Sequence, residues 1–81
     1  MTKKDIELLD KVMKFLEVTP DGIRHLADVE QDMYDKWSER KQESEKGEMT
    51  AELIDKLMET ADQLDEAVSL LQEALDLADE I

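Results

Sequence analysis

One histidine and three aspartates come closest to a chemical site in this sequence. Asp21, His25, Asp28 and Asp32 follow one another at helical spacing, so their side chains share one face of a helix. Carboxylates with one imidazole could hold a divalent cation. Acidic residues are also common at the start of a helix, where the helix dipole favours them. Because one histidine with separate aspartates makes a poor zinc site, we predict no metal ion, no cofactor and no enzymatic activity.

Composition excludes several other classes of protein. The 81 residues include no cysteine, which excludes a disulfide framework, a thiolate metal site and a cysteine nucleophile. The 23 acidic and 10 basic side chains give a net charge of −13, which repels nucleic acid and anionic lipid. No apolar run is long enough for a membrane span or a signal peptide. We therefore expect a cytoplasmic protein, in the host cell if a phage encodes it, with no direct nucleic-acid or membrane partner.

The hydrophobic pattern predicts an all-α fold. Apolar residues recur at spacings of three and four, and β-branched and aromatic residues are too few to build strands. Thr2 with Asp5 is typical of a helix start, as are Thr19 with Pro20, and Thr50 after a glycine. We predict one domain, 1–81, with helices over 3–18, 20–41 and 50–81 and a charged connector over 38–49.

These helices are expected to form a small three-helix antiparallel bundle. The segment 50–81 carries four unbroken apolar heptads, and a second apolar stripe joins the first in its C-terminal half. If the chain turns back at Pro20 and again at Gly47, Ile23 lies near Leu70. The predicted core consists of Ile6, Leu9, Met13, Leu16, Ile23, Leu26, Met33, Leu57, Ala61, Leu64, Val68 and Leu71.

The negative charge is concentrated in the last part of the chain. Residues 48–81 hold eleven acidic side chains and one basic one, Lys56. Like charges three or four residues apart on a helix repel one another, so such a row has a local cost. Local costs of this kind are typical of functional surfaces, although an acidic row also serves solubility. The predicted acidic partner-binding residues are Asp55, Glu59, Asp62, Glu66, Glu73, Asp76 and Glu80.

The acidic row favours an inhibitor or regulator that docks on a basic, nucleic-acid-handling protein. Carboxylates along a rigid helix can imitate the phosphates of a nucleic acid in long-range attraction. In size and charge the chain is similar to small phage inhibitors of nucleases, CRISPR effectors or transcription enzymes. This is a likeness of type that no shared motif carries.

The apolar residues support a different hypothesis, in which the protein is a helical adaptor, chaperone or antitoxin-like partner. It would bind through the apolar end of 50–81 or pair with a second copy of itself as a homodimer. A designed helical bundle is a lesser alternative. The residues predicted for the apolar interface are Trp37, Met58, Leu70, Leu75, Leu77 and Ile81.

Overall fold

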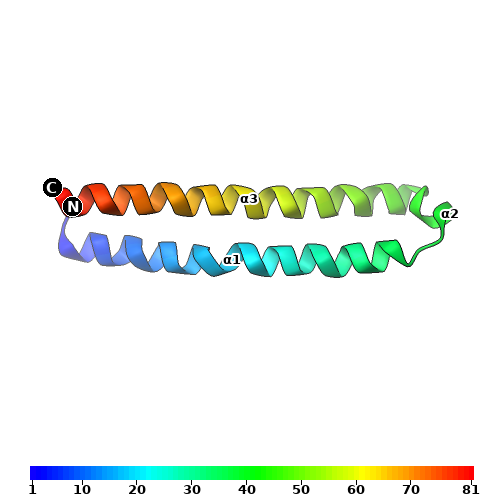
Figure 1. Cartoon of the computed structure of the whole chain (residues 1–81), viewed down its shortest axis with the longest axis horizontal. Coiled ribbons are helices and arrows are strands. Elements are labelled where there is room, and N and C mark those ends of the chain that lie inside the picture. Colours follow the sequence, from blue (N-terminus) through cyan, green and yellow to red (C-terminus); the bar gives the residue numbers. More distant parts are fainter.

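Two long antiparallel helices form an elongated hairpin in the computed structural model, which describes residues 1–81 (Figure 1). The elements are α1 (Lys3–Asp35), α2 (Glu39–Gln42) and α3 (Glu45–Glu80). No strand is present, so the all-α prediction is confirmed. The hairpin measures 59 × 14 × 13 Å, and both chain ends lie at the end opposite α2 (Figure 1).

The compact three-helix bundle that the sequence predicts is not formed. The Cα radius of gyration is 18.2 Å, against about 12 Å for a compact domain of this length. The helix expected to end at residue 18 continues through Pro20 to Asp35, and α3 begins at Glu45 rather than Thr50. A hairpin of two helices replaces the bundle because the chain reverses only once, around α2.

An unbroken seam between α1 and α3 explains why α1 passes Pro20. The seam has ten positions in each arm of the hairpin, spaced alternately by three and four residues, and every one is buried or half-buried. These are the a and d positions of a heptad pattern. The seam of α1 consists of Ile6, Leu9, Met13, Leu16, Pro20, Ile23, Ala27, Glu30 and Tyr34, and Trp37 continues the same spacing just after the helix ends. The seam of α3 consists of Gly47, Thr50, Ile54, Leu57, Ala61, Leu64, Val68, Leu71, Leu75 and Ala78.

Pro20 is accommodated as a buried seam residue. It is the largest fully buried side chain of the protein, so its ring fills space between the helices. It has no N–H to donate, and the Thr19 hydroxyl donates to the carbonyl oxygen of Phe15 at 2.8 Å in the same turn. Packing along the whole seam thus outweighs the helix-breaking tendency of a single proline.

We expect Pro20→Ala to stabilise the hairpin. A proline inside a helix costs about 3 kcal/mol relative to alanine, and the two lost methylene groups take back about 0.8 kcal/mol each. The free energy of unfolding should therefore rise by roughly 1–2 kcal/mol. Urea denaturation at matched protein concentration measures the change. A loss of stability would mean that ring packing at this position dominates.

Side chains of the connecting segments fix where the helices begin. The Thr2 hydroxyl accepts a hydrogen bond from the N–H of Asp5 at 3.2 Å, and the Asp5 carboxylate accepts one from the N–H of Thr2 at 3.1 Å. The N-cap expected at Thr2 is therefore confirmed. The hydrogen bond from the Thr2 backbone lowers the pKa of Asp5. The N-cap of α3 is Ser44 instead of Thr50, because the Ser44 hydroxyl accepts from the N–H of Gly47 at 3.2 Å.

The core differs from the predicted one in the second half of α1. Leu26 and Met33 were expected to be core residues and are exposed. Ala27, one position further along, is 1% exposed and takes the place expected for Leu26. The reason is the heptad register, which continues unchanged from the first half of α1 and does not restart after Pro20.

Candidate protein-binding site

The contacts of one arginine show the register of the hairpin. The guanidinium of Arg24 on α1 donates to the carboxylate of Asp62 on α3 at 2.9 Å and also to that of Asp65. These hydrogen bonds, that to Asp65 above all, raise the pKa of Arg24. Arg24 therefore lies opposite residues 62–65, whereas the predicted bundle placed Ile23 near Leu70.

Replacing Arg24 tests this register. We expect Arg24→Gln to lower the melting temperature more than Arg40→Gln, because Arg40 forms no ion pair and both changes remove one positive charge. The gap between the two variants should shrink as salt is added, since salt screens half-exposed ion pairs. Thermal melts followed by circular dichroism give the comparison. Equal melting temperatures at low salt would contradict the contact.

The contacts of Arg24 also show which heptad positions of the two helices lie on the same side of the hairpin. In heptad notation Arg24 and Asp65 both occupy e positions, and Asp62 occupies a b position. The b and e positions of both helices therefore share one side of the seam. Geometry then places the c and g positions of both helices together on the other side.

Shallow hollows near the chain ends agree with this assignment. Met1 lines one hollow with Leu8 and Val12 of α1, and a second with Leu77 and Ile81 of α3. All four helix residues occupy c or g positions. The c and g side chains of the two helices therefore meet on one side of the hairpin.

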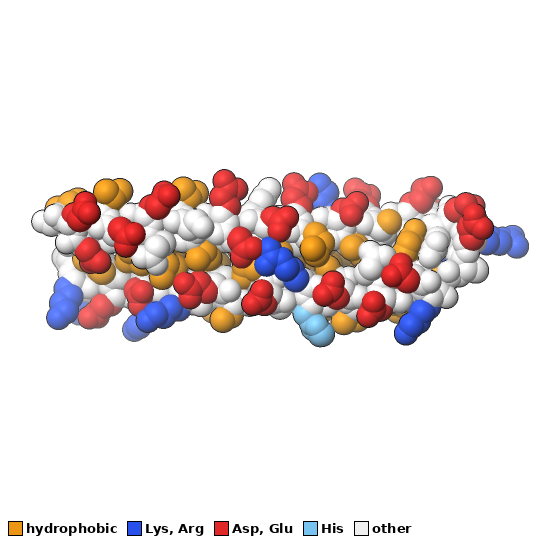
Figure 2. Space-filling model, viewed as in Figure 1, with side chains coloured by type: hydrophobic (Ala, Val, Ile, Leu, Met, Phe, Trp, Pro, Cys, Tyr) orange, Lys and Arg blue, Asp and Glu red, His pale blue; other side chains and the backbone are white.

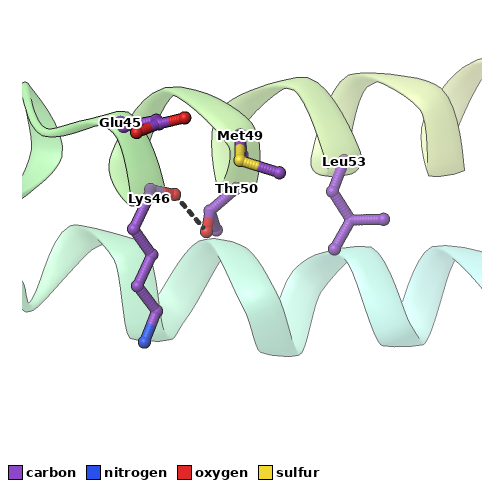
Figure 3. Close-up of a pocket in the computed structure, with 5 residues that line it drawn as sticks. All are labelled: Glu45, Lys46, Met49, Thr50 and Leu53. Atoms are coloured by element: carbon purple, nitrogen blue, oxygen red, sulfur yellow. Dashed lines mark hydrogen bonds between the residues drawn. The ribbon is translucent and has the colours of Figure 1, made fainter.

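The c and g side of the hairpin, which we call the apolar face, carries most of the exposed large hydrophobic side chains. Phe15 is 69% exposed and Leu70 is 59% exposed. At the loop end, Met49 and Leu53 line a further hollow beside Lys46, Glu45 and Thr50 (Figure 3). The exposed large residues of the apolar face are Leu8, Val12, Phe15, Leu26, Val29, Met33, Met49, Leu53, Leu70, Leu77 and Ile81.

The b and e side, which we call the polar face, is dominated by charge. Figure 2 shows acidic side chains spread over both helices on the face in view, with apolar atoms visible along the seam between them. Its members from α3 include Glu48, Asp55, Asp62, Asp65 and Asp76. Each helix thus presents opposite chemistry on its two sides.

A third feature is a row of glutamates on the outer edge of α3. The f positions of the heptad lie opposite the seam, and every f position of this helix is a glutamate. The glutamates therefore follow one another every seven residues along the helix. The sequence argument listed only the members of the row after residue 55; it omitted Glu52, and Glu45 precedes the helix start that it expected at Thr50. The members of this glutamate row are Glu45, Glu52, Glu59, Glu66, Glu73 and Glu80.

The structure divides the predicted acidic site. Glu59, Glu66, Glu73 and Glu80 belong to the glutamate row, whereas Asp55, Asp62 and Asp76 lie on the polar face. Asp62 already binds Arg24, Glu59 lies 3.4 Å from Lys56, and Asp76 accepts a hydrogen bond from Gln72 at 3.0 Å. Part of the acidic set is therefore paired within the chain.

The predicted apolar site is divided as well. Leu70, Leu77 and Ile81 are exposed on the apolar face, and Leu75 is buried in the seam. Met58 is exposed at an e position on the polar face.

Trp37 lies in the seam at the loop end. Its ring packs at 5.9 Å from that of Tyr34, and the ammonium of Lys41 lies 4.2 Å from its centroid. The amide of Gln42 donates to the carbonyl oxygen of Tyr34 at 2.8 Å beside it. The loop end is therefore held by packing around this tryptophan.

Sequence reasoning missed the loop half of the apolar face. It assigned Leu26 and Met33 to the core, and it did not list Val29 or Leu53 as surface residues. The signal that could have revealed them was present in the unbroken three-four spacing from Ile6 to Trp37.

No group of histidine, cysteine, aspartate and glutamate side chains is arranged to hold a metal ion. The helices of this hairpin do not combine the length and the apolar composition that crossing a membrane requires. No protein-family model, curated protein or solved structure matches the chain.

Proposed function

We propose that the protein is a non-enzymatic helical module that binds another protein chain through its apolar face. The observation that carries this proposal is that the exposed apolar stripes of α1 and α3 lie on the same side of the seam. Eleven large exposed hydrophobic side chains gathered on one side are typical of an interface, since exposed hydrophobic residues are scattered singly on most proteins. The apolar face therefore supports the hypothesis of a helical adaptor more strongly than that of an acidic inhibitor.

A second candidate function is docking of the glutamate row on a basic, nucleic-acid-handling protein as an inhibitor. The regular spacing of these glutamates favours it. The side chains of Glu66, Glu73 and Glu80 form no ion pair or hydrogen bond within the chain, so they are free to meet a cationic surface. Such docking should weaken steeply with salt.

Two sets of substitutions separate these functions. The face variant, Phe15→Glu with Leu70→Glu, places charge at two exposed positions of the apolar face. The row variant, Glu66→Lys with Glu73→Lys and Glu80→Lys, reverses charge on the edge and leaves the Arg24 contact untouched. A control, Met58→Glu with Ser69→Glu, adds the same charge as the face variant to the polar face.

The measurement is a pull-down with each variant as bait in an extract of cells that produce the protein. We expect the face variant to lose what the unaltered protein captures, and the row variant and control to retain it. Loss in the row variant alone would replace the proposal with the inhibitor function. Retention in both variants would rule out both surfaces.

A further inference from the structure

Each helix of the hairpin carries two apolar stripes, the second interrupted on α3 by Lys56, Thr60 and Gln63, and the angle between the stripes is that of a four-helix bundle. The seam is centred between positions a and d, and the apolar face between c and g. At about 100° per residue, these centres lie roughly 100° apart around the helix axis. A helix at the corner of a four-helix bundle meets its two neighbours at close to a right angle. Each helix therefore packs one apolar stripe against its partner helix and exposes a second stripe at the angle where another helix would pack.

We propose that a second copy of this chain covers the apolar face, so that two hairpins form a four-helix bundle. This inference rests on the proposed function, because it names the occupant of the same face. The two copies would use the same surface patch, as a two-fold symmetric dimer requires. All four helices then bury both of their stripes.

The available area is that of a stable dimer. An outline of 59 × 14 Å gives each hairpin a broad face of about 800 Å², the share of one partner in an interface of standard size. The single hairpin also exposes 6282 Å², whereas a compact protein of 9.4 kDa exposes roughly 5,000 Å². The surplus exposed surface is what pairing of the hairpins would remove.

Charge favours a second copy over a basic partner helix. The apolar face carries one acidic residue, Asp5, and three lysines, Lys36, Lys46 and Lys56, in a chain whose net charge is −13. This face is the one part of the surface that does not attract cations. Stacking two apolar faces points both polar faces outward, and the glutamate rows stay at the outer edges, which keeps most of the acidic groups of the two copies in water.

The same charges set the relative direction of the two hairpins. All three lysines lie in the loop half of the face, and Asp5 lies in the terminal half. Placing the loops at opposite ends brings the lysines of one copy to the terminal half of the other. The opposite choice would gather six lysines at one end. We therefore infer that the loops lie at opposite ends of the dimer.

Gly22 marks the centre of this arrangement. It occupies a c position near mid-length of the hairpin, and a Cβ built there would meet no atom within 4 Å. With loops at opposite ends, α1 of one copy crosses α1 of the other at this level. A glycine at the crossing lets the two backbones approach closely.

Sedimentation equilibrium tests the dimer. We expect twice the chain mass for the unaltered protein and for the polar-face control, and the chain mass for the face variant. Added salt should strengthen the dimer, because it screens repulsion between acidic chains without weakening apolar contacts. If the face variant loses its helical circular dichroism, the unaltered protein still tests the inference. The melting temperature of a dimer rises with protein concentration, and that of a monomer does not.

The outcomes separate the two proposals. A helical monomer at every concentration, with a melting temperature independent of concentration, overturns the second-copy inference. The proposed function then stands or falls on the pull-down. A dimer that persists in the face variant shows that another surface pairs the chains, and it overturns the inference as well.

A single cysteine tests the direction of stacking. The chain has no native cysteine, so Thr19→Cys, one turn from Gly22 on the apolar face, introduces the only thiol. We expect a short bifunctional thiol reagent to join two copies through this residue in high yield, and Ser69→Cys on the polar face to give no linked dimer. If dimeric Thr19→Cys protein stays unlinked while Ser69→Cys behaves as expected, the loops do not lie at opposite ends.

Discussion

Replacing Ala61 by leucine is expected to be the most damaging change, with a loss of about 3 kcal/mol in the free energy of unfolding. Ala61 is 0% exposed, so its methyl group lies wholly within the contact between α1 and α3. A leucine adds three carbon atoms where close-packed helices leave no space. The hairpin can admit them only by separating its helices around residue 61.

The matched control is Ser69→Leu, which places the same side chain on the exposed polar face of the same helix. Urea denaturation at equal protein concentration should show Ala61→Leu far below the unaltered protein and Ser69→Leu within about 0.5 kcal/mol of it. If both variants unfold at the same urea concentration, position 61 does not lie in a tight helix contact.

The second large effect is expected at Gly47. It is buried in the first turn of α3, and a Cβ there would overlap the backbone carbonyl oxygens of Lys41 and Gln42. Backbone atoms cannot move aside as a flexible side chain can, so Gly47→Ala must displace the α2 turn from α3. We expect a loss of about 2 kcal/mol in the free energy of unfolding.

Gly22→Ala is the contrasting substitution for a single chain. Nothing lies within 4 Å of a Cβ at this position, and alanine is favoured over glycine inside a helix by about 1 kcal/mol. Gly22→Ala should therefore stabilise the face variant, in which the apolar face is not paired, whereas Gly47→Ala destabilises it. Thermal melts of the face variant carrying either Gly22→Ala or Gly47→Ala measure the two effects. Equal effects of the two would contradict the placement of Gly47 against α2.

Local sequence signals predicted the helices well where the capping residues and the apolar pattern indicate the same helix. The Thr2 cap, the absence of strands and the apolar repeat of α3 follow from side-chain chemistry within a few turns. Pro20 misled the prediction because the local rule for proline favours a helix start. The seam of α1 outweighs that rule, since tertiary packing is distributed over the whole helix.

The candidate site could be predicted only in part. Leu70, Leu77 and Ile81 were recognised as apolar and exposed, and so was the acidity of α3. Their relation to Leu8 and Phe15 depends on how the two helices pair. That pairing is visible in the contacts of Arg24 with its two aspartates, which span about forty residues of sequence.

The methionines of the chain report directly on which face is covered. Met33 and Met49 lie on the apolar face, Met58 lies on the polar face, and Met13 is buried in the seam. Met49 is 64% exposed in the single hairpin and Met58 is 39% exposed. Oxidation of methionine by peroxide follows exposure, so a free hairpin should oxidise Met49 faster than Met58.

Peroxide oxidation of the purified protein, with each methionine followed by peptide mass spectrometry, therefore tests the covered apolar face most directly. As protein concentration rises, we expect the rates at Met33 and Met49 to fall below that of Met58, while Met13 stays protected throughout. Met49 remaining faster than Met58 at every concentration would contradict the account, because the apolar face would then stay open to solvent.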